Sequence, residues 1–183
     1  MTVSRWTRGW IVAALLALAG CSGTTQGAAA TMNVRPFAPE LAQVFDDAVD
    51  YLEDVSQLGG RAAADWRRQV QGLARESDVI VTVRIETVTG GEDQSSRSYR
   101  LTAVGTRTPL KGQLEGDHRV DLRVNEGDNG FNTVRGNFTR LQSGEFLMFL
   151  RWAPEGDEGR RARWHLSPAS PALASASSAD SST

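Results

Sequence analysis

Few residues of this chain are suited to covalent chemistry: it has one cysteine, Cys21, and two histidines, His118 and His165. Cys21 follows the tripeptide Leu18-Ala19-Gly20, whose small residues let a peptidase approach the bond before the cysteine. With a single thiol, the chain can form neither an internal disulfide nor a thiolate metal cluster. Burial of apolar side chains must therefore hold the folded body together.

The two histidines have no partners at the spacings that zinc or catalytic sites use. Neither belongs to an HxH or HxxxH pattern, and the sequence has no nucleophile elbow, P-loop or dinucleotide-binding fingerprint. The period of its strand places His118 at the edge of the core. His165 points opposite to Trp164 and Leu166, toward solvent. We predict no catalytic residue, no metal and no cofactor.

The segment before Cys21 has the features of an export signal. Arg5 and Arg8 give it a positive start, and residues 10–19 are apolar but fewer than the roughly 20 that span a bilayer. Together with Leu18-Ala19-Gly20-Cys21, this segment resembles the signal peptide of bacterial lipoproteins. An ordinary signal peptide with an incidental cysteine is the alternative.

The lipoprotein resemblance implies how the new N-terminus is made. In that family the thiol, here that of Cys21, is diacylated, the preceding peptide, here 1–20, is removed, and the freed amino group is usually acylated too. At about 0.8 kcal/mol per buried methylene, several acyl chains anchor a protein durably. Ser22 stands where inner-membrane lipoproteins of enterobacteria carry aspartate. The resemblance therefore favours an outer-membrane, lipid-anchored protein that faces the periplasm.

Length and charge limit the function further. A chain of 183 residues is long enough for one domain with its own core. Its net charge is −2, and removal of Arg5 and Arg8 with the leader makes the remainder more acidic. Because no basic surplus is available to neutralise phosphates, we exclude nucleic acid as a partner. The expected partners are the membrane, through the lipid, and an envelope protein.

Two flanking segments have too few large apolar residues to form a core. Residues 21–36 are rich in serine, threonine, glycine and alanine, which predicts a flexible tether. Residues 169–183 consist mostly of serine and alanine, which predicts a disordered tail. The folded part then comprises residues 37–76 and 77–168.

Residues 37–76 show the helical period. Between 41 and 55, apolar residues recur at steps of three and four, and Pro39 suits the first helical turn. The acidic residues between them predict a solvated helix face rather than a cation site. They are Asp46, Asp47, Asp50, Glu53 and Asp54. A second helix is predicted from 61 to 75, and we expect the two to pair as an antiparallel hairpin.

From residue 77 onward the period changes to two. Alternating apolar residues predict strands over 79–86, 99–104 and 118–125. Residues 146–152 are almost continuously apolar, as in a strand buried on both faces, and 163–166 predict a last short strand. Five or six antiparallel strands of this size close most readily into a small barrel or a curled sheet.

The order of these segments is similar to that of OB-like β-barrel domains in uncharacterised secreted and lipid-anchored bacterial proteins. The resemblance rests on Leu110-Lys111-Gly112, on a glycine-rich turn, and on Gly144-Glu145 before the apolar strand. It implies a fold and a compartment but no activity. The predicted fold class is α+β: an N-terminal helical hairpin packed on a five- to six-stranded, mostly antiparallel β-sheet or OB-like barrel, flanked by a disordered tether and tail.

Arginine and tryptophan are the residue types that most often anchor interfaces. The candidate binding surface comprises Arg135, Asn137, Arg151, Trp152, Trp164 and His165. We predict a non-enzymatic binding or assembly module at the outer membrane. One alternative is an envelope hydrolase acting on peptidoglycan or lipid, which needs His118 or His165 beside a carboxylate in one cleft. Another is a pilotin-like escort for a secretion or motility complex.

Overall fold

The computed structural model describes residues 36–52, 54–92, 96–156 and 159–178. The predicted signal peptide, the lipidation site Cys21 and the tether up to residue 35 lie outside the described residues. Within the described part of the chain, no helix is both long enough and apolar enough to cross a membrane.

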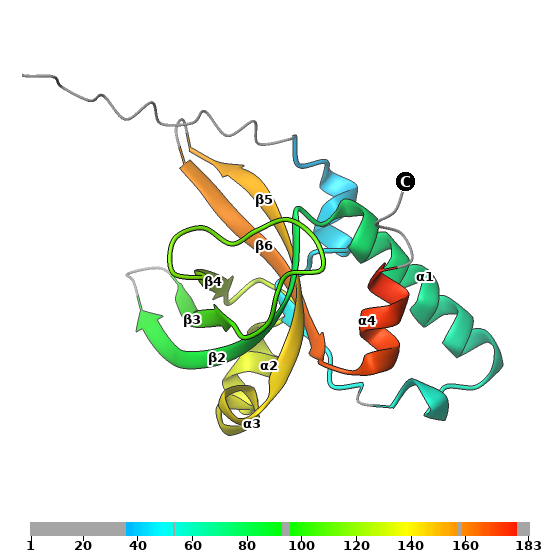
Figure 1. Ribbon diagram of the computed structural model, residues 1–183. Helices are drawn as coiled ribbons and strands as arrows, with labels where there is room; N and C mark the ends of the chain where they lie inside the picture. The colour runs from blue at the N-terminus through cyan, green and yellow to red at the C-terminus, as the bar shows by residue number, and fades with distance from the viewer. Residues whose placement is uncertain (1–35, 53, 93–95, 157–158, 179–183) are drawn as a thin grey trace, which may run out of the picture. The chain divides into compact units, whose positions relative to one another are not determined.

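Six strands form one mixed, mostly antiparallel sheet that curls into a half-barrel (Figure 1). The strands are β1 (Ala48–Val49), β2 (Val79–Glu92), β3 (Arg97–Gly105), β4 (Arg119–Asn125), β5 (Glu145–Glu155) and β6 (Gly159–Pro168). Their order in the sheet is β1-β6-β5-β2-β3-β4. β1 pairs in parallel with β6, and the other neighbours are antiparallel. The predicted α+β class with a mostly antiparallel, curled sheet is confirmed.

The alternation of the strands builds the core on the inner face of the half-barrel. Val120, Leu122 and Val124 of β4 are buried there together with Leu101 and Ala103 of β3. The alternate residues of β4, from Arg119 onward, are exposed or half-buried. A period of two therefore decides which side chains of β4 enter the core and which stand on the outer face.

β5 is buried on both faces, as its apolar sequence predicts. Met148 and Leu150 belong to the inner core, and Leu147 and Phe149 belong to a second cluster on the outer face. The long helix α1 (Gly60–Glu76) covers this outer cluster with its apolar stripe. The second of the two predicted helices is thus present.

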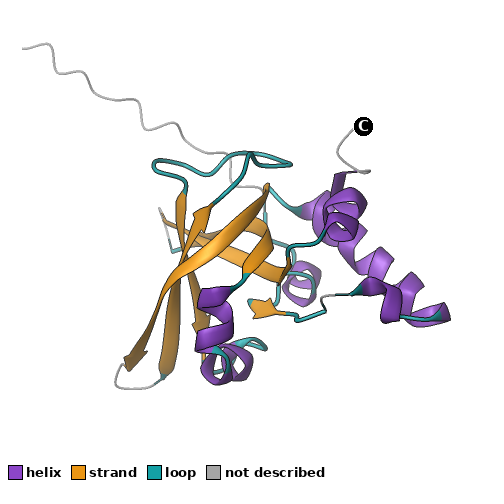
Figure 2. Ribbon diagram, turned by 60° about the horizontal axis from the view of Figure 1, so that its bottom comes forward, coloured by secondary structure: helices purple, strands orange, loops and turns teal. Residues whose placement is uncertain are grey.

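Two short helices connect β4 to β5, where the sequence pattern is irregular and predicted no helix. They are α2 (Phe131–Gly136) and α3 (Phe138–Ser143), and they lie together at one end of the sheet (Figure 2). Phe131, Val134 and Leu141 are buried against the inner core. These helices therefore close that end of the half-barrel.

The first helix of the predicted hairpin is not formed. The described residues of this region contain a 3-10 turn at Pro39–Gln43, the short β1 and a second 3-10 turn at Val55–Gln57. Asp47 has a φ of +52°, which an α-helix cannot accommodate. Its segment is extended because Asp46, Asp47 and Asp50 contact cationic side chains of β6. The prediction of a helical hairpin with a solvated acidic face over residues 37–76 is wrong.

The predicted disorder of the tail is also wrong over its described part. β6 continues to Pro168, and α4 (Pro171–Ser178) follows it beside α1 (Figure 1). Leu173 is only 2% exposed and packs in the outer cluster with Leu73 and Phe149. Ser177 of the same helix is fully buried as well, so α4 packs through a leucine and small residues.

Candidate functional site

β4 and β6 face each other across the open side of the half-barrel. Among the described residues no backbone ladder joins these two strands. Instead, Trp164 Nε1 donates to Arg123 O at 3.2 Å, and a guanidinium N–H of Arg161 reaches the same oxygen at 3.5 Å. We call the stretch between residues 119–123 of β4 and 159–162 of β6 the seam.

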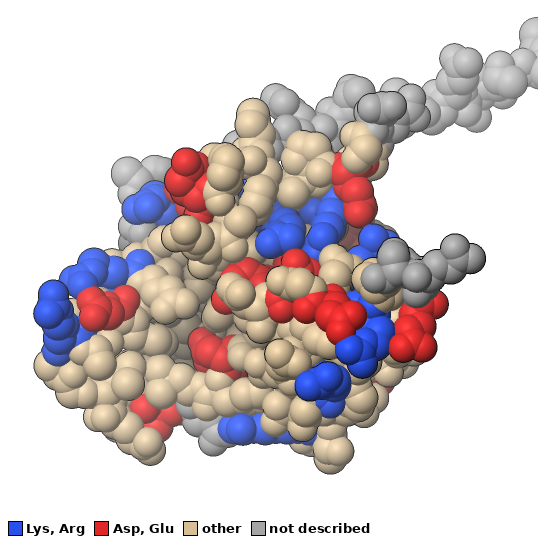
Figure 3. Space-filling view, turned by 180° about the vertical axis from the view of Figure 1, so that it is seen from behind, with Lys and Arg blue, Asp and Glu red and all other residues tan. Residues whose placement is uncertain are grey.

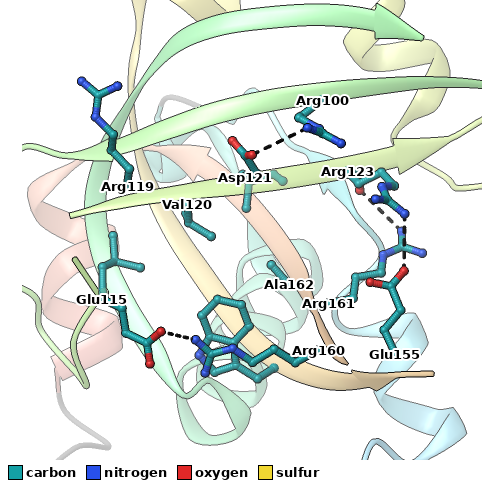
Figure 4. Close-up of a pocket in the computed structure, with 13 residues that line it drawn as sticks. Arg100, Glu115, Arg119, Val120, Asp121, Arg123, Glu155, Arg160, Arg161 and Ala162 are labelled. Atoms are coloured by element: carbon teal, nitrogen blue, oxygen red, sulfur yellow. Dashed lines mark hydrogen bonds and ion pairs between the residues drawn. The ribbon is translucent and has the colours of Figure 1, made fainter. Parts of the chain in front are cut away.

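A groove of about 350 Å³ lies along the seam (Figure 4). Its walls come from β3, β4, β5 and β6 and from the loop before β4. Basic residues outnumber acidic ones in the lining. The basic residues are Arg100, Arg119, Arg123, Arg160 and Arg161, and the acidic ones are Glu115, Asp121 and Glu155.

The outer side of the groove carries exposed ion pairs. Arg123 lies 3.4 Å from Glu155, and Arg100 lies 4.0 Å from Asp121, as the dashed lines of Figure 4 show. All four side chains are roughly half exposed, so each pair contributes less than about 1 kcal/mol. A carboxylate or phosphate of a ligand can therefore replace these acidic partners at little cost.

The inner side of the groove is apolar, and a tryptophan side chain lies at one end of it. Leu114, Val120 and Ala162 are buried residues that line it. At one end, the Arg160 guanidinium lies 3.8 Å above the Trp152 ring and is paired with Glu115 (Figure 4). Arginine stacked on tryptophan combines a cation–π contact with a planar hydrogen-bond donor.

Asp47, the residue before β1, ties the groove to the N-terminal segment. Its Oδ2 lies 2.6 Å from Arg161 and 2.9 Å from Arg163, and its Oδ1 accepts the Trp164 N–H at 3.1 Å. Burial raises the pKa of Asp47 to about 7, although the charges of Arg163 and Arg161 lower it. Arg161 also lies 3.1 Å from Asp128, in the turn after β4.

His165 lies between two carboxylates on the outer face of β6. Its Nδ1 is 3.0 Å from Asp46 and its Nε2 is 3.2 Å from Asp50, which also accepts the Ser167 hydroxyl at 2.6 Å. Burial would lower the pKa of His165, but hydrogen bonds and charge from both aspartates raise it to about 9. Burial would raise the pKa of Asp50, but hydrogen bonds from His165 and Ser167 hold it below its ordinary value.

The structure does not gather the predicted binding residues into one surface. Trp152 lines the groove. Trp164 is fully buried, and Arg151 is 3% exposed and donates to Glu76 O at 2.8 Å. His165 is buried between its aspartates rather than pointing to solvent. Three of the six candidates therefore hold the fold together.

Of the other two candidates, Arg135 lies on α2 and Asn137 lies between α2 and α3, and neither lines the groove. Arg135 is exposed with its guanidinium 5.9 Å from the Phe131 ring, and Asn137 donates to Thr133 O at 2.8 Å. Sequence reasoning did not name Arg100, Arg119 and Arg123 as binding residues. The alternation of β4, which predicted an outward Arg119, was the available signal.

His118 and His165 are not part of one site. His118 is an exposed residue with φ +61° in the turn before β4, whereas His165 is buried on β6. Among the described residues, no group of histidine, cysteine, aspartate and glutamate side chains has the arrangement of a metal site. Neither histidine lines the groove.

Comparisons of this chain with protein-family models, with curated proteins and with solved structures find no match. On the face shown in Figure 3, acidic and basic side chains lie beside each other, and no large area carries basic side chains alone. That distribution does not favour a polyanion such as nucleic acid on this face.

Proposed function

We propose that this chain is a lipid-anchored envelope protein that binds a partner through the groove without catalysing a reaction. The observation that carries the proposal is the composition of the groove: exposed arginines on its outer side and a half-buried tryptophan within it. These residue types dominate the energetics of protein interfaces. Acyl chains on Cys21 would attach the protein to the outer membrane, with the groove facing the periplasm.

We propose further that the body is an OB-like barrel. Support comes from the order β6-β5-β2-β3-β4, which places β4 and β6 opposite each other across the seam. Closing the seam would produce a five-stranded Greek-key barrel, and OB-folds are partly open barrels of this kind. The helical connection between β4 and β5 lies at one end of the sheet, where it caps the core.

Binding is favoured over hydrolysis by the state of the histidines. A general base must accept a proton near neutral pH. With a pKa of about 9, His165 is already protonated there, and it is buried between Asp46 and Asp50. His118 lies elsewhere, in an exposed turn. The hydrolase alternative needs a histidine and a carboxylate in one cleft, and the groove lining contains no histidine.

The anchor is tested by Cys21→Ala in the full-length chain, produced in a Gram-negative host. We expect the variant to remain folded, to leave the outer-membrane fraction and to incorporate no labelled palmitate. Circular dichroism of the purified variant checks the fold. Continued fractionation with membranes together with continued palmitate labelling would show that the anchor is wrongly assigned.

The groove is tested with a photo-crosslinking amino acid at Glu155, which lines it. Asp65 on α1 is a matched control position, because its side chain is 54% exposed and that of Glu155 is 48% exposed. In intact cells we expect a discrete envelope product from position 155 that is absent from position 65. Adding Arg123→Glu should reduce this product. Identical products from both positions would contradict binding at the groove.

A further inference from the structure

The backbone N–H and C=O groups of alternate residues of β4 point into the seam. Gly105 N–H donates to His118 O, so the even-numbered residues of this stretch pair with β3. In an antiparallel ladder the N–H and C=O of the intervening residues point the other way. Arg123 O does so, since donors from β6 reach it. The peptide groups of Arg119 and Asp121 therefore point into the seam as well.

β6 presents the opposite edge. Asp47 N–H donates to Trp164 O at 3.0 Å, and Asp50 N–H donates to Leu166 O at 2.9 Å. The peptide groups of the even-numbered residues of β6 therefore point away from β5. β1 covers this edge beside His165 and Leu166. Ala162 lies before the covered part, and its peptide groups point toward β4. The seam is thus bordered by two strand edges that form no ladder with each other among the described residues.

The two sides of the seam differ in chemistry. Side chains that point inward are apolar: Leu114, Val120, Leu122 and Ala162 are buried residues of the inner core. Side chains that point outward include four arginines, each of which pairs with at least one carboxylate of the chain. Arg100 pairs with Asp121, Arg123 with Glu155, Arg119 with Glu86 and Asp117, and Arg161 with Asp47 and Asp128. A strand placed in the seam would meet apolar atoms on one face and, on the other, arginines whose exposed ion pairs its carboxylates would have to replace.

We propose that the seam accepts an extended segment of a partner protein in which apolar residues alternate with acidic ones. The segment would pair its backbone with the edges of β4 and β6, pack its apolar side chains on the inner core and place its carboxylates beside the outer arginines. Because side chains of a strand alternate between its faces, the seam selects a period of two. This inference rests on the proposed function, since it names the partner class of the same groove.

The observations favour a peptide over a polyanion. The outer side alternates in charge along β4, with Asp121 between Arg119 and Arg123. A nucleic acid or polyphosphate has no peptide N–H and C=O groups with which the edges of β4 and β6 could form a ladder. An extended peptide supplies backbone donors and acceptors that the two strand edges can pair with.

The test uses the purified full-length chain in detergent and a fluorescent peptide of alternating valine and glutamate, as long as the seven residues of β4. Fluorescence anisotropy measures its dissociation constant. A peptide of the same composition with its valines and glutamates in two blocks should bind at least about tenfold more weakly, because it cannot place one residue type on each face. An alternating valine and lysine peptide should not bind measurably.

N-methylation of alternate peptide bonds separates strand pairing from charge attraction. It removes ladder donors but keeps every side chain, so we expect a loss of about tenfold or more in affinity. On the protein, Asp121→Pro removes a backbone N–H that points into the seam. Proline is tolerated at this position because β4 is an edge strand. Arg123→Glu should weaken binding, whereas Arg67→Glu, an exposed arginine of α1, should not. Melting curves of each variant confirm folding.

Each result decides between distinct outcomes. Tight binding of the alternating peptide, lost on N-methylation and on Arg123→Glu, supports strand addition. Undiminished binding of the N-methylated peptide overturns strand pairing but leaves the groove as a binding site. No binding of any acidic peptide overturns the inference, and the crosslinking from position 155 then tells whether the proposed function falls with it.

Discussion

Asp47 and Arg161 form an ion pair of 2.6 Å between the segment that leads into β1 and the strand that borders the groove. The Asp47 carboxylate is fully buried, whereas the Arg161 side chain is 20% exposed and lines the groove. The position of one groove wall therefore depends on a buried charge. Because burial raises the pKa of Asp47 to about 7, that charge changes close to neutral pH.

Asp47 should make the folded chain less stable as the pH rises from about 4 to about 7. Its pKa is about 7 in the folded chain against an ordinary value of 3.8, so in this interval the folded state binds more protons than the unfolded state. Stability then falls with pH, by an amount on the order of 4 kcal/mol. Urea unfolding at a series of pH values measures the slope.

Asp47→Asn keeps an oxygen that can accept the Trp164 N–H but removes the titration. We expect this slope to disappear in the variant. Asp128→Asn is the control, because it removes the other carboxylate partner of Arg161 and should leave the slope in place. If stability still falls with pH in Asp47→Asn, groups other than Asp47 cause the slope.

His165 should add a second fall in stability at higher pH. Its pKa is raised from 6.5 to about 9, so its contribution is complete below pH 6.5 and is lost as the pH rises through about 9. The expected loss is on the order of 3 kcal/mol. Asp50, whose pKa is lowered, acts in the opposite sense and only at acid pH. His165→Gln should flatten the unfolding profile between pH 6.5 and 9; an unchanged profile would contradict the assignment.

Elements with local signals could be predicted from the sequence. The alternation of β4 and the apolar run of β5 each determine one strand and its buried faces. The course of residues 44–50 could not be predicted, because its apolar spacing is that of a helix. Asp47 is held in place by Arg161, 114 residues later in the chain, and a helical period carries no information about so distant a partner.

The candidate site was predictable in residue type but not in position. Trp152 was named and lines the groove, whereas Trp164 and Arg151 were named and are buried. Which arginine is exposed depends on where the sheet curls and which strand edges remain open. Besides Trp152, the alternation of β4, which places Arg119 and Arg123 on its outer face, indicates part of the groove wall.

Leu173 should be essential for docking α4, although its segment is otherwise composed of small residues. The side chain is 2% exposed within the outer cluster, so Leu173→Ala should lower the free energy of unfolding by about 2–4 kcal/mol. Leu110, which is 39% exposed, is the matched control, and Leu110→Ala should cost about 0.5 kcal/mol or less. Equal small losses from both substitutions would mean that α4 adds nothing to the fold.

Gly112 permits a close approach that fixes the loop before β4. With φ at +63°, it lies so near β2 that an added Cβ would be 2.1 Å from Asp78 O. The preceding Lys111 exchanges backbone hydrogen bonds with Ile80, and its Nζ donates to the Ala74 carbonyl at the end of α1. The cation there also compensates the negative end of the helix dipole. Gly112 therefore lets the loop come close enough for Lys111 to contact both β2 and α1.

Gly112→Ala should cost about 3 kcal/mol in unfolding free energy, since it combines a left-handed φ with a backbone clash. Gly116 separates the two causes, because its φ is +60° but an added Cβ meets nothing within 4 Å. Gly116→Ala should cost only about 1 kcal/mol. Because the same loop carries Glu115, which pairs with Arg160 in the groove, Gly112→Ala should also weaken binding of the acidic peptide. Equal losses of stability from the two alanine variants would show that φ alone, and not the approach to Asp78, determines the need for glycine.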